Sequence, residues 1–132
     1  MPRVYEKGEK RHKHETANPQ PTIAFDPHNP KKWVGKCPVG MAEDLRTRLL
    51  NEAIPAPIGD REIDFPKRLY VVHDGAIYEA RTSNHGISYH GFPYRGKLRA
   101  SLVDALRVMA TTKGCLAAFE VWLKTNVIIQ GR

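Results

Sequence analysis

The chain has 132 residues, and its 21 lysines and arginines outnumber its 14 aspartates and glutamates to give a formal net charge of +7. This length corresponds to one domain, and a hydrophobic content of 41% allows a small core and excludes a wholly disordered chain. No stretch approaches the roughly 18 apolar residues of a transmembrane helix, and the first 36 residues lack the apolar run of a secretory signal. We therefore expect a cytoplasmic protein with no membrane contact.

The N-terminal segment is rich in proline, with six of the ten prolines in the first 38 residues. Proline fixes φ and removes an amide donor, which favours extended backbone over helix. Residues 1–20 carry few large apolar side chains, so little burial would offset the entropy of ordering them, and we expect a disordered basic tail. Residues 21–38 contain Ile23, Phe25 and Trp33, and we expect a Pro-rich extended strap anchored by Trp33 on a single domain of residues 39–132.

The first helix is predicted at residues 41–54, because apolar residues recur there at helical spacing. Glu43 and Asp44 lie in its first turn, where negative charge complements the helix dipole. Pro55 and Pro57 follow the pattern and end the helix.

Two short strands are predicted at residues 68–72 and 76–81, on either side of Asp74 and Gly75. Asp-Gly is a strong hairpin signal because both central residues of a type I′ turn have positive φ. The spacing therefore predicts an antiparallel hairpin with a two-residue turn.

This turn also fixes which residues face one another. It places Arg68 opposite Arg81 and Tyr70 opposite Glu79 on one face of the hairpin. Two arginines directly opposite repel, so that face needs an acid or a bound anion near that end unless the strands splay. The opposite face is the apolar one and carries Leu69, Val71, Tyr78 and Ala80.

The last third of the chain predicts two more helices. Ser101, followed three residues later by Asp104, resembles a capping box at the start of a second helix. This helix ends near Lys113, with Gly114 in the left-handed cap position. A third helix is predicted at residues 116–129.

A third strand at residues 87–90 and a loop at residues 91–99 complete the pattern. Together the elements indicate an α+β domain in which a small antiparallel sheet, a hairpin plus a third strand, packs against about three helices on one face. The extended basic tail precedes it.

The densest functional candidate is the segment at residues 89–99, which interleaves three aromatic rings with three permanent positive charges. Rings can stack on unpaired bases, and cations can neutralise phosphates, so the segment is expected to bind RNA or another single-stranded nucleic acid together with the Arg68/Arg81 face. The alternative is a connecting loop whose rings fill the edge of the core and whose cations are only solvated. The candidate binding residues are Tyr89, Phe92, Tyr94, Arg95, Lys97, Arg99, Arg68 and Arg81.

A second hypothesis is a metal-independent, toxin-like ribonuclease. Such an enzyme needs a base, an acid and cations that stabilise the charge of the transition state. His90 is the candidate base, with Arg95 and Lys97 as charge stabilisers and the acid unassigned. His85 lies five residues earlier, on the opposite face of a continuous strand, and His73 lies beside the hairpin turn.

Metal and cofactor sites are not indicated by any motif. There is no C-x-x-C, H-E-x-x-H or P-loop spacing, and Cys37 and Cys115 lack neighbouring ligands, so we expect reduced thiols, no metal and no cofactor.

A third hypothesis is a protein-interaction module whose acidic partner binds the same basic surface. The sequence alone leaves open whether the protein is an enzyme.

Overall fold

The computed structural model describes residues 21–26, 28–36, 43–55, 68–82 and 88–130. The predicted tail at residues 1–20, Cys37, His85 and most of the segment between the first helix and the hairpin lie outside these ranges. Within them, no helix combines the length and the apolar character needed to cross a membrane.

The centre of the described structure is an antiparallel sheet with the strand order β3-β4-β5-β6. Asp74 and Gly75 have φ values of 50° and 89°, as the predicted turn between β4 and β5 requires. The predicted register is confirmed, with Arg68 paired to Arg81 and Tyr70 to Glu79. The strands are β3 (Ile54–Pro55), β4 (Arg68–His73), β5 (Ala76–Arg81) and β6 (His90–Pro93).

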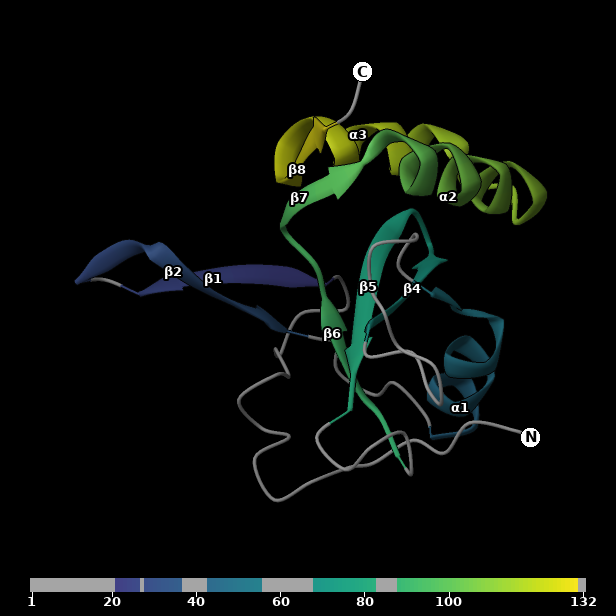
Figure 1. Cartoon of the computed structure of the whole chain (residues 1–132), viewed down its shortest axis with the longest axis horizontal. Coiled ribbons are helices and arrows are strands. Elements are labelled where there is room, and N and C mark those ends of the chain that lie inside the picture. Colours follow the sequence, from purple (N-terminus) through teal and green to yellow (C-terminus); the bar gives the residue numbers. More distant parts are fainter. Residues whose placement is uncertain (1–20, 27, 37–42, 56–67, 83–87, 131–132) are drawn as a thin grey trace.

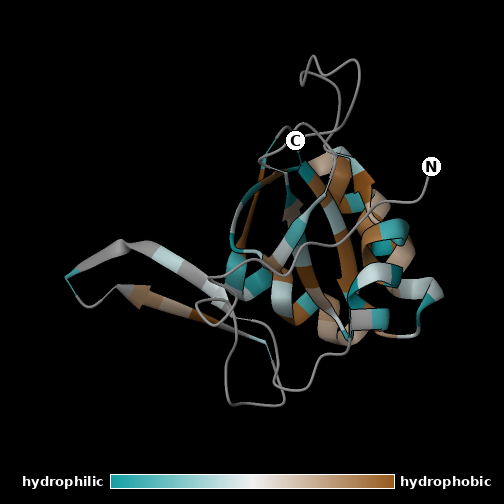
Figure 2. Ribbon diagram, turned by 90° about the horizontal axis from the view of Figure 1, so that it is seen from below, coloured by the Kyte–Doolittle hydropathy of each residue, from teal (hydrophilic) through white to brown (hydrophobic). Residues whose placement is uncertain are grey.

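Helices cover both faces of this sheet. The α+β class is confirmed, but the expectation of helices on one face is wrong: α1 (Glu43–Glu52) packs on one side, and α2 (Ala100–Thr112) with α3 (Leu116–Asn126) on the other. Figure 1 shows α2 and α3 side by side at the end of the sheet where β4 turns into β5. Both faces of the strands are therefore core, and the central strands are largely apolar in Figure 2.

Two separate apolar clusters result from this arrangement. The cluster on the α1 side contains Leu49, Leu50, Ala53, Leu69, Val71, Ala76, Tyr78, Ala80 and Tyr89. The cluster on the α2 and α3 side contains Tyr70, Val72, Ile77, Leu98, Leu102, Val103, Leu106, Ala110, Phe119 and Leu123.

Several predicted boundaries in the C-terminal half are wrong. The expected strand at residues 87–90 is β6, which begins only at His90, and the expected loop contains β6 and β7 (Gly96–Arg99). The third helix ends at Asn126, because Val127–Gln130 forms β8, which pairs in parallel with β7. The β-branched run of Val127, Ile128 and Ile129 favours a strand.

The ends of α2 also differ in part from the prediction. The N-cap residue is Arg99 and makes no side-chain capping bond, so the capping box expected at Ser101 and Asp104 is absent. Gly114 follows the helix with a φ of 74°, and its left-handed conformation is confirmed.

The N-terminal part of the described chain is a projecting hairpin, which we call the arm. Residues 22–36, within the expected strap, form β1 (Thr22–Asp26) and β2 (Asn29–Lys36), paired antiparallel. Figure 1 shows the arm extending away from the body, with its base beside β6. A Cβ at Gly35 would lie 1.9 Å from the carbonyl oxygen of Pro93, so only glycine allows this close approach.

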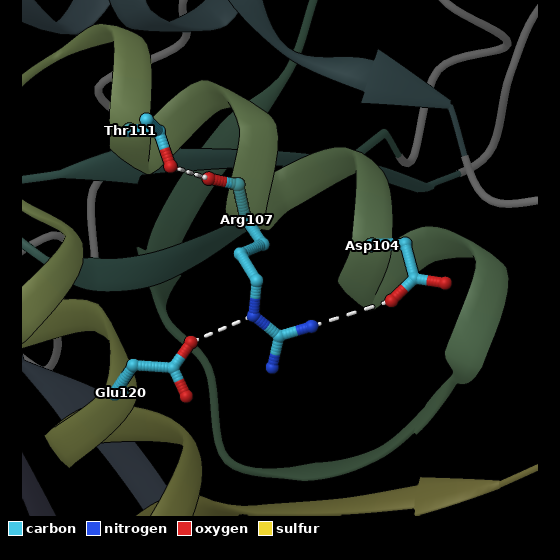
Figure 3. A network of polar contacts seen from close by, with 4 residues as sticks. All are labelled: Asp104, Arg107, Thr111 and Glu120. Carbon is cyan, nitrogen blue, oxygen red and sulfur yellow. Dashed lines mark hydrogen bonds and ion pairs between the residues drawn. The ribbon is translucent and has the colours of Figure 1, made fainter.

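A polar network holds α2 against α3 (Figure 3). Arg107 Nε donates to Oε1 of Glu120 at 2.7 Å, and Arg107 Nη1 donates to Oδ1 of Asp104 at 3.3 Å. The Thr111 hydroxyl donates to the Arg107 carbonyl at 2.9 Å. The pKa of Arg107 is raised, chiefly by its hydrogen bond to Glu120. Because these groups are exposed, an ion pair of this kind contributes at most about 1 kcal/mol.

On the outer edge of β4, side chains of α2 and of the residue that follows it form hydrogen bonds with the backbone amide and carbonyl of Val72. β3 pairs only with Leu69 and Tyr70, and beyond it the amide of Val72 donates to Sδ of Met109 at 3.3 Å. Lys113 Nζ donates to the Val72 carbonyl oxygen at 2.6 Å and to Oε1 of Glu52 at 2.7 Å. One ammonium group thus joins the end of α2 to the sheet and to α1, and it blocks an otherwise open strand edge.

We expect Lys113→Met to lower the free energy of unfolding by about 1.5 to 3 kcal/mol, because it removes a charged hydrogen bond to a strand carbonyl. Lys124→Met is the matched control, since Lys124 is exposed and should change stability by no more than about 0.5 kcal/mol. Urea denaturation of both variants measures the difference. Equal stabilities would show that the lysine bridge does not stabilise the fold.

Candidate functional site

One face of the central sheet carries a row of basic residues across three strands. Arg68 of β4 pairs with Arg81 of β5, which pairs with His90 of β6. We call these three residues the basic row. Arg68 and Arg81 are exposed and His90 is half-buried. The row lies at the end of the sheet opposite the β4–β5 turn, and α2 and α3 lie at the turn end (Figure 1).

A second row follows two residues further into the same face, because alternate residues of a strand share a face. It consists of Tyr70, Glu79 and Phe92. Glu79 is completely buried. Its Oε2 accepts a hydrogen bond of 2.6 Å from the Tyr70 hydroxyl, and its Oε1 accepts one from Arg81 Nε. The acid expected beside the opposed arginines is therefore Glu79.

Burial and the nearby carboxylate of Glu79 together raise the pKa of two tyrosines. Burial raises the pKa of Tyr70, and the charge of Glu79 and its hydrogen bond raise it further. Burial also raises the pKa of Tyr94, with the charge of Glu79 as the second cause, while Arg68 and Arg81 act in the opposite direction. Both phenols stay protonated at neutral pH, so Tyr70 is a donor to Glu79 and not a base.

An aromatic cluster links the sheet to the arm. The ring centroid of Trp33 lies 6.2 Å from that of Phe92 and 5.8 Å from that of Tyr94, and Tyr94 lies 5.5 Å from Tyr70. The guanidinium of Arg81 lies 5.6 Å from the Phe92 centroid. The sequence indicated Trp33 as an anchor but carried no signal of these partners, which are distant in the chain.

Two of the three rings predicted to stack on bases are buried, and the third is half-buried. Tyr89 is 2% exposed and lies in the α1-side cluster, on the other face of the sheet. Phe92 is 8% exposed and lies beneath Arg81. Tyr94 is half-buried, and its hydroxyl donates to the Lys97 carbonyl at 3.0 Å. This arrangement favours the interpretation in which the rings fill the edge of the core.

The three cations of the same segment have different environments. Arg95 Nη1 donates to the Thr125 carbonyl at 3.2 Å, and its guanidinium lies 4.9 Å from the ring centroid of Phe25 in the arm. Arg95 therefore joins α3 to the arm. Lys97 and Arg99 are exposed on β7, away from the basic row. The predicted cations thus form two groups, one at each end of the sheet.

Phe25 is a candidate that was not among the residues predicted from the sequence. It pairs directly with Trp33 across the arm, and it is 47% exposed. Its position beside Arg95 gives the arm one accessible ring next to a cation. The signal in the sequence was only the presence of two aromatic residues in a Pro-rich segment.

His73 and His90 do not form a catalytic pair. His90 lies 6.4 Å from the Phe92 ring, whereas His73 is at the turn end of β4, with Nε2 3.4 Å from Oδ2 of Asp74. The two imidazoles are at opposite ends of the sheet. The described residues also contain no group of three or more histidine, cysteine, aspartate or glutamate side chains placed to hold a metal ion.

No family model, curated protein or solved structure matches the chain. Its function therefore has to be inferred from its own residues and their arrangement.

The coupling of the tyrosines to Glu79 predicts a change in their titration. In Glu79→Gln the pKa of both Tyr70 and Tyr94 should fall, and that of Tyr70 should fall further because it also loses the hydrogen bond to a carboxylate. Tyrosinate absorbance against pH measures this, and Tyr70→Phe and Tyr94→Phe assign the transitions. An unchanged titration would contradict the coupling.

The same shifts set the alkaline limit of stability. The unfolded tyrosines ionise near 10.0, below their folded pKa values, so stability is fully present below pH 10 and is lost as the pH rises above it. Thermal melts across this range should show a smaller alkaline decline for Tyr70→Phe than for the wild-type protein.

Proposed function

We propose that this protein acts in the cytoplasm by binding RNA or another single-stranded nucleic acid through phosphate contacts. The observation that carries the proposal is the pairing of Arg68 with Arg81 at the end of the sheet opposite the β4–β5 turn, where both side chains are exposed. The carboxylate beside them, Glu79, is fully buried and neutralises only one of them. Among the described groups at this position, two arginines stand beside one carboxylate, which leaves one positive charge in excess.

A second group of cations supports the same function. Lys97 and Arg99 are exposed on β7, and their side chains form no ion pair or hydrogen bond with the described part of the chain. Lysine and arginine that neutralise phosphates release counterions, so such binding is strongly salt-dependent and depends little on base sequence. The formal net charge of +7 favours the approach of any nucleic acid.

The preference for single strands rests on the arm. Tyr89 and Phe92 are buried and Tyr94 is half-buried, so the exposed aromatic ring among the described residues is Phe25. A base stacked on Phe25 would lie beside Arg95, whose guanidinium is already fixed against that ring. Stacking on an aromatic side chain requires an unpaired base and contributes about 1 to 3 kcal/mol.

Salt-dependent titrations of a fluorescent single-stranded RNA test this proposal. We expect Lys97→Ala and Arg99→Ala each to weaken binding and to flatten the dependence of log K on log salt by roughly 0.7 for each phosphate that the variant no longer neutralises. Phe25→Ala should weaken binding by about 1 to 3 kcal/mol without changing the slope, because stacking releases no counterions. Phe92→Ala should instead lower the melting temperature, because its ring is packed.

Arg48→Ala is the matched control. It removes the same charge from α1, on the opposite side of the sheet, and should leave the slope unchanged. If the Arg48 variant bound RNA as weakly as the Lys97 variant, the binding would result from net charge alone. A wild-type protein that binds an acidic polypeptide but no RNA at low salt would instead favour the protein-interaction module.

A further inference from the structure

Among the described residues of the basic row, two arginines stand beside one carboxylate, so this part of the sheet carries an excess of positive charge. Arg68 and Arg81 are direct cross-strand partners, a position at which Cβ atoms are about 5 Å apart and like charges destabilise the sheet. His90 adds an imidazole on the other side of Arg81. The acid in contact is Glu79, and both of its oxygens are already used by Tyr70 and Arg81.

Two groups of this row, Arg81 and His90, are held by contacts within the protein. Arg81 Nε donates to Glu79, and its guanidinium lies over the ring of Phe92. His90 lies against the same Phe92 ring, tilted by 31°. Arg68 has no ion pair or hydrogen bond with the residues that the structure describes, and its guanidinium is exposed. Guanidinium groups present paired donors that match the oxygens of a phosphoryl group.

The number of donors indicates which phosphoryl group fits. An internal phosphodiester carries one negative charge and two free oxygens, which a single arginine can bind. A phosphomonoester carries a charge of about −1.5 to −2 and three acceptor oxygens. Two guanidinium groups and an imidazole in one row match the three acceptor oxygens of the monoester in the number of donors.

We propose that Arg68, Arg81 and His90 bind a phosphomonoester dianion, supplied by the terminal phosphate of a bound nucleic-acid strand. This inference rests on the proposed function and names the group on the strand that the site selects.

The test compares three RNA oligonucleotides of one sequence, with a 5′-phosphate, a 3′-phosphate or hydroxyl groups at both ends. The wild-type protein should bind one phosphorylated form at least about tenfold more tightly than the hydroxyl form. Arg68→Ala should abolish that preference and leave the melting temperature close to that of the wild-type protein. Arg68→Lys should keep part of it, because the charge remains while the paired donors are removed.

Lys97→Ala is the control variant, because Lys97 lies on β7 and not in the row. It should weaken binding of all three oligonucleotides by the same factor and preserve the preference. Equal binding of the three by the wild-type protein would overturn the terminal-phosphate site while leaving RNA binding intact. A preference that survives in Arg68→Ala would overturn it as well.

A separate titration with phenyl phosphate and with inorganic phosphate, followed by the His90 imidazole resonances, distinguishes the source of the dianion. Saturable shifts that are absent in Arg68→Ala support the site, and phosphorylated RNA should displace the small ligand. If the small ligands bind but RNA does not, the dianion site stands and the proposed RNA function fails. No shift with either ligand would overturn the site.

Discussion

The carboxylate of Glu79 is buried in the middle of the sheet, away from water. A buried carboxylate is tolerated only when other groups donate hydrogen bonds or a positive charge to it, and removing such a partner destabilises the fold. Tyr70 supplies a hydroxyl donor and Arg81 supplies a positive charge. Removing one partner from a buried ion pair costs about 3 to 5 kcal/mol, so the position of Arg81 is fixed by the core and not by the surface. The register of the strands then places Arg68 and His90 on either side of Arg81.

The aromatic cluster depends on the same carboxylate. Phe92 lies beside Glu79 in the sheet, and Tyr70, Tyr94 and Trp33 continue the cluster toward the arm. This apolar surrounding strengthens the interaction of Glu79 with its donors, because a low local dielectric weakens screening. It also attaches the arm, through Trp33, to the strand that carries His90. The exposed Phe25 is therefore held at a fixed distance from the charged groups by packing around the buried ion.

The parts of the fold that could be predicted from sequence are those determined by local chemistry. Asp74 and Gly75 specify a two-residue turn, and the turn sets every pair of the hairpin, including Arg68 with Arg81. The burial of both faces of the sheet could not be predicted in the same way. Tyr70 and Glu79 are polar residues, which on a strand usually indicate a face exposed to solvent, and the hydrogen bond between them is not visible in the sequence. Nor could the helical period at residues 116–129 show that Val127 would pair with Gly96 of a distant strand. The candidate site combines β4, β5 and β6 with the arm, and no local pattern reports such contacts.

The distance between the basic row and the cations of β7 determines how long a ligand must be to contact both groups. Arg81 and Ile77 are four residues apart along β5, which is about 13 Å in a strand, and Lys97 lies beyond the Tyr94 that bonds to Ile77. A mononucleotide can occupy one group at a time, whereas a strand of several nucleotides can contact both. Once one end is bound, the second contact is intramolecular and gains from a high effective concentration. Affinity should therefore increase with strand length until both groups are occupied and then level off.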